Sequence, residues 1–356
     1  MAQFGRTLMQ TIWFCIVAVM VAMYVVLDGF DLGAGALHFL VAKDECERQQ
    51  VIRAIGPVWD GNEVWLLAGG GTLYFAFPAL YAAGFSGFYL PLMVVLWLLI
   101  LRGVSVEFRS HLTTTVWIHF WDVVFAAASL LLAVFFGAAL GNVVRGVPLN
   151  QQGYFFEALW TNFRIGPNPG VLDWYTILVG VAALVTLMVH GALWLALKTE
   201  GAVHDRAVGW ARGLWWALLA MTLLVTVVTF AIQPHVPDRF AHNPWQFIFP
   251  ALAIAGLGGT AWFMQKHDDL KSFLSSCAYI VGMLTSVVFG VYPLVLPAST
   301  DPAYSLTIDN AKAGDYGLKI GLAWWLVGVI LVTIYHIHVY RSFAGKVRAE
   351  AGKEDY

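Results

Sequence analysis

Hydrophobic and polar positions divide this chain into long apolar runs that are joined by short polar connections. A helix needs about 20 consecutive apolar residues to cross a bilayer, and nine of the runs approach or exceed that length. We therefore expect nine transmembrane helices, at 11–32, 58–78, 82–101, 116–140, 172–197, 211–232, 246–265, 275–296 and 320–340. The predicted fold class is an all-α integral membrane protein, with residues 1–356 forming a single membrane domain.

The composition agrees with a membrane protein and leaves no room for a large soluble domain. Hydrophobic residues make up 60% of the chain and charged residues 12%, against about 25% charged residues in ordinary soluble domains. Mean hydropathy is +0.72. The first apolar run has no small-residue cleavage site, so we interpret it as a span and not as a signal peptide. The net charge of −2 gives no indication of a nucleic-acid partner.

Motifs for metal or nucleotide chemistry are missing from the sequence. The three cysteines are far apart and form no CxxC motif, so we expect no structural zinc, iron–sulfur cluster or disulfide framework. Walker A, dinucleotide-binding, HExxH and GxSxG motifs are also missing. Two GxxxG pairs, Gly29/Gly33 and Gly137/Gly141, predict close packing between helices.

Basic residues predict the orientation in the membrane. An odd number of spans places the termini on opposite sides, and cytoplasmic loops carry an excess of Lys and Arg. The face with the N-terminus holds six of the 20 basic residues, namely Arg6, Arg145, Arg164, Arg239, Lys312 and Lys319. The remaining basic residues lie on the face with the C-terminus. We therefore expect a cytoplasmic C-terminus and an N-terminus on the opposite side.

Six charged residues fall at the predicted cytoplasmic ends of the first four spans. They are Asp28 and Asp31 in the first, Asp60 and Glu63 in the second, Arg102 in the third and Asp122 in the fourth. An ionisable side chain within a span costs about 2.5–3.5 kcal/mol on insertion scales, so such residues usually pair, line a wet path or take part in chemistry. We expect these side chains to lie at one level of the membrane.

This pattern leaves several interpretations open. Poorly solvated carboxylates can relay protons along a wet cavity. Alternatively, Arg102 forms ion pairs that fix the helix bundle, or Asp28 and Asp60 only cap helix ends. A further alternative is a secondary transporter or ion-conducting protein that uses the same carboxylates to bind a coupling ion.

Histidines raise the question of haem ligation, because a membrane redox protein can ligate haem through His residues in its spans. His190 lies in the inner half of the fifth span, and His336 and His338 lie at the inner end of the ninth. A pairing of His190 with one of them stays open. We take a satisfied or interfacial histidine as the default, and we predict no metal site in this chain.

Several motifs resemble those of a known family, subunit II of the cytochrome bd-type quinol oxidases. The most specific similarity covers about residues 24–125, with DGFDLG, GPVWDGNEVWLLAGGGTLYFAFPALYAAGFSGFYLP, LRGVSVEFRSH and WDVVF. It extends more loosely through GNVVRGVP and YPLVLPAS. The cyanide-insensitive branch of the family is one candidate for its closer affiliation.

The resemblance implies an architecture of two four-helix bundles and one peripheral helix in the bacterial inner membrane. It assigns 1–140 and 172–296 to the bundles, 141–171 to a periplasmic loop, 320–340 to the ninth helix and 341–356 to a cytoplasmic tail. It also implies a periplasmic N-terminus, a pseudosymmetric heterodimer with a haem-bearing subunit I, and small single-span accessory subunits.

The resemblance further implies an electrogenic enzyme complex that oxidises quinol and reduces dioxygen to water. Haem b and haem d are expected in the partner subunit, with none ligated by this chain. A structural quinone or lipid is expected between the helices. This chain would support assembly of subunit I and contribute to a cytoplasmic proton path, with no catalytic residue of its own.

Residue by residue, the resemblance assigns roles to several of the acids. The proton-path acid of WDGN corresponds to Asp60, the second acid of DGFDLG to Asp31, and the acid of WDVVF to Asp122. The tryptophan of NEVWL, Trp65, would lie on an oxygen route. Glu63 departs from relatives that carry a neutral glutamine, and it adds either a second protonatable site or a surface ion pair. The predicted proton path comprises Asp60, Glu63, Asp31, Asp28 and Asp122, with Arg102 as ion-pair partner.

Overall fold

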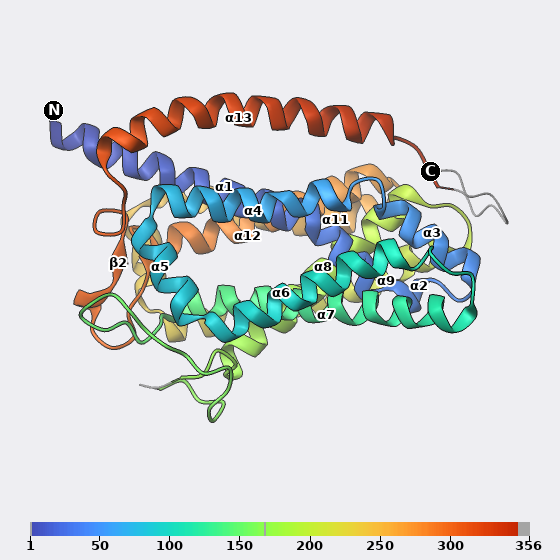
Figure 1. Ribbon diagram of the computed structural model, residues 1–356, viewed down its shortest axis with the longest axis horizontal. Helices are drawn as coiled ribbons and strands as arrows, with labels where there is room; N and C mark the ends of the chain where they lie inside the picture. Colours follow the sequence, from blue (N-terminus) through green and yellow to red (C-terminus); the bar gives the residue numbers. More distant parts are fainter. Residues whose placement is uncertain (1, 167–168, 348–356) are drawn as a thin grey trace.

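Nine long helices run roughly along the long axis of the molecule in this computed structural model, which describes residues 2–166 and 169–347 (Figure 1). They are α1 (Ala2–Ala36), α4 (Trp59–Ala76), α6 (Tyr89–Phe108), α7 (Thr115–Arg145), α8 (Trp174–Lys198), α9 (Ala202–Ile232), α11 (Ile248–Gln265), α12 (Asp269–Val291) and α13 (Asp315–Ser342). Short helices α2 (His38–Val41), α3 (Glu45–Ile55), α5 (Pro78–Gly87) and α10 (His235–His242) connect them. The all-helical fold class is confirmed.

Eight of these helices, within the described ranges, are long and apolar enough to cross a membrane. The helix that does not qualify is α4, the expected second span, whose 18 residues include Asp60, Glu63 and three consecutive glycines. Nine spans and the division into two bundles with a peripheral helix therefore stay predictions.

Two predicted spans differ in their bounds from the helices of the structure. The third was expected at 82–101, but α5 ends at Gly87 and α6 begins only at Tyr89, two residues before Pro91. Proline favours the first turn of a helix, since its missing N–H has no helical partner there. The eighth was expected at 275–296, but α12 ends at Val291, before Pro293, and Leu294–Leu296 forms strand β1. Proline restricts the preceding residue to extended conformations, which ends the helix.

Glycines allow α1 and α7 to approach α8 closely, as the GxxxG pairs predict. A Cβ added to Gly33 would lie 1.8 Å from the carbonyl oxygen of Leu187, and one added to Gly137 would lie 2.7 Å from the Cα of Gly180. Both helices contact α8 along their length. The prediction of close packing is therefore confirmed. Helix α1 lies at the centre of the molecule, where it contacts α4, α7, α8 and α12.

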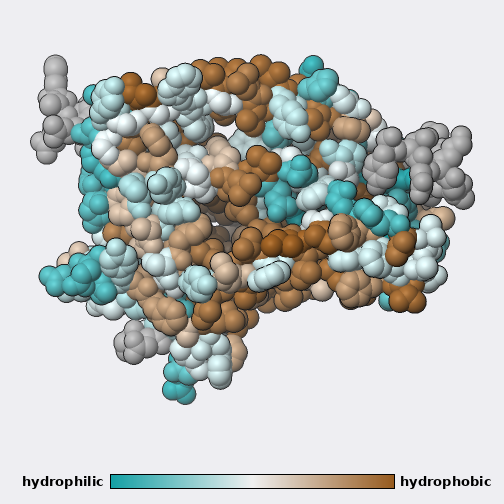
Figure 2. Space-filling view, in the orientation of Figure 1, coloured by the Kyte–Doolittle hydropathy of each residue, from teal (hydrophilic) through white to brown (hydrophobic). Residues whose placement is uncertain are grey.

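The two ends of the molecule differ in structure (Figure 1). We call one the α3 end; it holds α2, α3 and the described residues that follow α13. The other, the strand end, holds the connection 146–173 and the antiparallel strands β1 and β2 (Leu306–Thr307), with the 3-10 helices η1 (Pro244–Phe247) and η2 (Pro302–Tyr304). Figure 2 shows hydrophobic residues over much of α13 and hydrophilic residues toward both ends. Of the predicted tail 341–356, residues 348–356 lie outside the described ranges.

Candidate functional site

Three helices bring charged side chains together in the half of the molecule nearer the α3 end. Helix α1 contributes Asp28 and Asp31, which share a face because they are three residues apart. From α6, Arg102 reaches both α1 and α4: its Nη1 lies 2.7 Å from Asp28 Oδ1, and its Nη2 donates to Glu63 Oε2 at 2.8 Å. We call these four residues the Arg102 cluster. The sequence placed them at one level, and the structure brings them together.

An amide that the sequence reading missed completes this arrangement. Asn62 of α4 donates from Nδ2 to Asp31 Oδ2 at 2.8 Å. Asp28, Asp31, Asn62 and Arg102 are buried, whereas the Glu63 side chain is 23% exposed. Glu63 therefore gives the cluster an edge that reaches the surface of the chain.

Several atoms of the Arg102 cluster lack hydrogen bonds. Oδ2 of Asp28, Oδ1 of Asp31 and Nε of Arg102 are buried without a hydrogen-bond partner among the described residues, and the ion pair between Arg102 Nη1 and Asp28 Oδ1 lacks hydrogen-bond geometry. Leaving a buried polar atom unpaired costs about 1–3 kcal/mol, and more for a charged group. Three carboxyl groups also face one guanidinium, so full ionisation would leave uncompensated negative charge inside the protein.

Asp60 does not enter this cluster. It is exposed in the first turn of α4, one turn before Glu63, and it forms no hydrogen bond or ion pair with the other described residues. Its place at the membrane level of the other acids stays a prediction. Its carboxylate is near enough to Glu63 to act on it electrostatically.

Asp122 belongs to a separate and well-paired cluster and does not contact the Arg102 cluster. It is buried, with Oδ1 2.9 Å from His38 Nε2 and 2.6 Å from Arg109 Nε. Arg48 Nε lies 3.1 Å from its other oxygen, and Arg109 also donates to Glu45 of α3 at 2.6 Å. These contacts tie α2, α3 and the end of α6 to α7. Burial lowers the pKa of His38, which lies beyond the end of the first span, although the hydrogen bond to Asp122 opposes this.

Helix α13 contacts α4 through two polar side chains one turn apart. Trp65 is buried and donates from Nε1 to His336 Nε2 at 2.9 Å. Tyr340 donates its hydroxyl to Asn62 Oδ1 at 2.8 Å. Two hydrogen bonds therefore join Tyr340 to Asp31 through Asn62. No local sequence signal marked this link, because Tyr340 is 278 residues from Asn62.

His190 is fully buried, and both of its ring nitrogens have protein partners. Nδ1 lies 2.7 Å from Ser276 Oγ, and Nε2 lies 2.9 Å from the Val26 carbonyl oxygen. The ring stacks on Phe273 with centroids 4.8 Å apart. A metal could bind this histidine only by displacing one of these partners. Across the described ranges, no group of three His, Cys, Asp or Glu residues is arranged to hold a metal ion.

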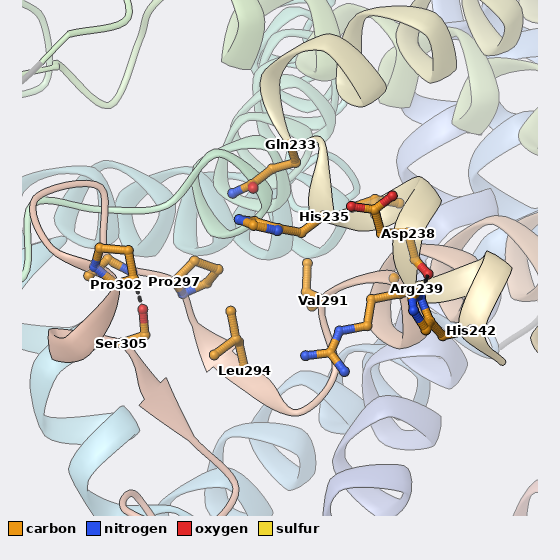
Figure 3. Close-up of a pocket in the computed structure, with 13 residues that line it drawn as sticks. Gln233, His235, Asp238, Arg239, His242, Val291, Leu294, Pro297, Pro302 and Ser305 are labelled. Carbon is orange, nitrogen blue, oxygen red and sulfur yellow. Dashed lines mark hydrogen bonds between the residues drawn. The ribbon is translucent and has the colours of Figure 1, made fainter.

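One cavity lies at the strand end, away from the Arg102 cluster, and is larger than a second cavity at the α3 end. It has a volume of about 560 Å³, and α10 supplies His235, Asp238, Arg239 and His242 to its wall (Figure 3). Its other side is formed largely by the apolar residues around β1. The smaller cavity, of about 260 Å³, lies at the α3 end, and Tyr340 is part of its wall. The larger cavity is thus not the carboxylate site.

Comparison with known proteins gives a consistent result over the whole chain. The family model for cytochrome bd terminal oxidase subunit II matches residues 9–343. The probable cytochrome oxidase subunit 2 of Haemophilus influenzae is 32% identical, over 96% of each chain. The cytochrome bd ubiquinol oxidase subunit 2 of Bacillus subtilis is 30% identical, over 88% of this chain and 89% of that protein.

A more distant relative and a solved structure agree with these matches. The cytochrome bd-I ubiquinol oxidase subunit 2 of Escherichia coli is 29% identical, over 96% of each chain. The bd oxidase from Geobacillus thermodenitrificans has a chain that superposes with a TM-score of 0.74. That match covers 94% of this chain and 98% of the other at 16% identity, and it supports the fold alone. The chain therefore belongs to the cytochrome bd terminal oxidase subunit II family.

Proposed function

We propose that this chain supports assembly of the haem-bearing subunit I and carries protons from the cytoplasm toward the site of dioxygen reduction. Family membership makes the chain a multi-pass membrane subunit of a terminal quinol oxidase, an oxidoreductase complex of the respiratory chain. Its relatives from Bacillus subtilis and Escherichia coli are named as subunits of ubiquinol oxidases. Quinol and dioxygen are the substrates of such a complex, and its haems belong to the partner subunit.

The chemistry of the complex calls for a proton supply. Reduction of dioxygen to water consumes one proton for every electron that quinol delivers. If those protons come from the cytoplasm while quinol releases its own outside, turnover separates charge across the membrane without a pump. The excess of basic residues on the face with the C-terminus supports an orientation in which the α3 end is cytoplasmic.

The observation that carries the proposal is the unsatisfied state of the buried Arg102 cluster. Oδ2 of Asp28 and Oδ1 of Asp31 have no hydrogen-bond partner among the described residues, whereas Oδ1 of Asp28 forms an ion pair with Arg102 Nη1 at 2.7 Å. A purely structural ion pair is stabilising only when such atoms are paired. Oxygens that stay unpaired can take up and release protons, and we infer that this is their role.

The proposed route begins at Asp60, on the exposed start of α4. It continues through the half-buried Glu63 to Asp28 and then to Asp31, with protons held at carboxyl oxygens. Arg102 does not lose its own proton, because a guanidinium stays charged in proteins; it positions Glu63 and Asp28 instead. Asp122 is paired with His38, Arg48 and Arg109 in its own cluster. We therefore propose that it stabilises the contact between helices and does not carry protons on this route.

Other parts of the proposal concern the haems and dioxygen. Both ring nitrogens of His190 have polar partners within the chain. This supports the proposal that the chain ligates no haem and that subunit I binds haem b and haem d. Trp65 is the candidate for the oxygen route, and its contact with His336 would fix its ring beside α13. Accessory single-span subunits and a structural quinone or lipid complete the assembly that we propose.

Asp60→Asn tests the entrance of the route, because it keeps the side chain's shape and removes the titrating group. We expect slower quinol oxidation or a smaller membrane potential at normal haem content, with partial recovery in Asp60→Glu. The measurement is turnover per haem d and potential generation in proteoliposomes. Asp205→Asn is the control, since Asp205 is 80% exposed at the start of α9. Wild-type values in Asp60→Asn would exclude Asp60 from the route, and a low haem yield at normal turnover per haem would assign it to assembly.

A further inference from the structure

The smaller cavity, at the α3 end, has a wall with positive charge and no carboxylate. Its basic residues are Arg53 at the end of α3, Lys198 at the end of α8 and Lys346 in the segment after α13. None of the described residues in its wall is Asp or Glu. The larger cavity differs, because Asp238 lies next to Arg239 in its wall (Figure 3). The smaller cavity is therefore the better candidate for binding an anion.

The two lysines are held in place by contacts that leave donors available. Lys198 Nζ donates to the Phe343 carbonyl oxygen at 2.6 Å and lies 5.7 Å from the centroid of the Trp194 ring. Lys346 Nζ donates to the Ala196 carbonyl oxygen at 3.3 Å and lies 3.4 Å from Asp269 Oδ2. Each ammonium group has three donors, so both retain hydrogens for an oxyanion. Asp269 lies beside Lys346, whereas the contacts of Lys198 Nζ are a carbonyl oxygen and an aromatic ring, so the charge of Lys198 is available to an anion.

The size and surroundings of the cavity indicate the class of anion. Its volume of about 260 Å³ is below the roughly 300–1,000 Å³ of pockets for drug-sized ligands. Trp194 and Phe343 give it an apolar side, and it lies among helix ends at one end of the membrane domain. Basic pockets between transmembrane helices on the cytoplasmic side bind anionic lipid headgroups. We propose that this cavity is an anion site for a phosphate group, supplied by an anionic phospholipid headgroup or by soluble phosphate.

Occupation of this site has a structural consequence. The cavity is formed jointly by α3, α8 and the segment 342–347, so a phosphate held there crosslinks the end of α13 to the main body. Tyr340 lines the same cavity and is hydrogen-bonded to Asn62. The bound anion thus stabilises the contact of α13 with α4. A ligand that binds only the folded state raises the unfolding temperature, and the shift grows with the logarithm of ligand concentration once that exceeds Kd.

The experiment compares two double variants of the whole oxidase complex. Lys198→Gln with Lys346→Gln removes two cations of the cavity. Lys266→Gln with Lys271→Gln is the matched control, since these lysines lie at the same end of the molecule but outside the cavity wall. Each delipidated complex is heated in the presence of cardiolipin micelles, phosphatidylcholine micelles or inorganic phosphate alone. Native mass spectrometry counts the phospholipids that each complex retains.

We expect cardiolipin, and not phosphatidylcholine, to raise the unfolding temperature of the wild type and the control. The cavity variant should lose most of this shift and retain fewer anionic lipids. An equal shift with inorganic phosphate alone would assign the site to soluble phosphate. Equal shifts and equal lipid counts in the cavity variant and the control would overturn the proposal. If the double variant does not assemble, Lys346→Gln alone gives the same comparison at a more exposed position.

Discussion

Two buried arginines, Arg102 and Arg145, each face more than one carboxyl group, but their surroundings differ. Arg145, at the end of α7, donates to Glu157 and Asn142 at 2.7 Å each and to Asp173. It also donates to two backbone carbonyl oxygens of the connection 146–173. Asp173 in turn caps the start of α8, accepting from two backbone N–H groups. Nearly every hydrogen-bonding atom of this Arg145 cluster is used.

The Arg102 cluster contains the same types of residues with far fewer hydrogen bonds. Only Nη2 of the Arg102 guanidinium has a hydrogen bond of good geometry among the described residues. In the Arg145 cluster, the buried side-chain atom left without a partner is Oε2 of Glu157. Paired charges fix a fold, whereas unpaired carboxylate oxygens beside a surface-reaching glutamate can exchange protons. We therefore interpret the Arg145 cluster as an anchor of the connection 146–173, and we keep the Arg102 cluster as the site that we propose for proton transfer.

Removing Arg145 should give the largest loss of stability. Arg145→Ala leaves Glu157 and Asp173 buried without their cation, and breaking a buried pair in this way costs about 3–5 kcal/mol. We expect a low yield of haem-loaded complex and a strongly lowered unfolding temperature. Arg164→Ala, at an exposed position of the same connection, is the control. Normal yield and unfolding temperature in Arg145→Ala would show that this cluster is not an anchor.

Glu157 should make stability depend on pH. Burial raises its pKa from 4.5 to about 7, even though Arg145 acts in the opposite direction. Because the folded-state pKa lies above the unfolded one, the folded state keeps a proton that the unfolded state loses, so stability falls as pH rises from about 4.5 to about 7. The contribution is on the order of 3 kcal/mol.

Unfolding temperatures of the wild type and Glu157→Gln, measured in steps from pH 5 to pH 8, test this expectation. The wild type should lose more stability than the variant between pH 5 and pH 7, and the two curves should run parallel above pH 7. Parallel curves over the whole range would mean that Glu157 ionises as easily in the folded protein as in the unfolded chain.

Tyr340→Phe should have the smallest effect of the three. It removes one hydrogen bond to Asn62, worth about 1 kcal/mol, and leaves Asn62 with its contact to Asp31. We expect normal haem content and a small decrease in unfolding temperature, together with a modest decrease in turnover. Tyr316→Phe is the control, since Tyr316 is 80% exposed on the same helix. A loss of haem in Tyr340→Phe would mean that α13 holds the assembly more strongly than its contacts indicate.

Depth along the membrane could be read from the sequence, whereas rotation about each helix axis could not. Hydropathy located the long helices, and span order placed Asp28, Glu63 and Arg102 at one level, where the structure brings them together. The same reasoning put Asp60 and Asp122 at that level but could not tell which way they face. One is exposed and the other pairs with His38 in a separate cluster.

Partners distant in sequence were also beyond prediction. Asn62 is uncharged, so the cost of burying an ionisable group in the membrane did not single it out, although it lies between Asp60 and Glu63 in the motif. Tyr340 reaches Asn62 only because α13 packs on α4, which no local pattern indicates. The differences at the third and eighth spans have a simpler cause, since apolar runs continue through Phe88 and Pro293 while the helices do not.

The most direct test of the central claim compares Asp31→Asn, in the Arg102 cluster, with Asp173→Asn, in the Arg145 cluster. Both changes turn a buried carboxyl group into an amide of the same shape. The measurement is turnover per haem d with potential generation in proteoliposomes, normalised to the haem content of each complex. We predict that Asp31→Asn assembles with normal haem but turns over slowly and generates little potential. Asp173→Asn should lose haem while each assembled complex turns over normally. Wild-type turnover and potential in fully assembled Asp31→Asn would contradict the proton role of the Arg102 cluster.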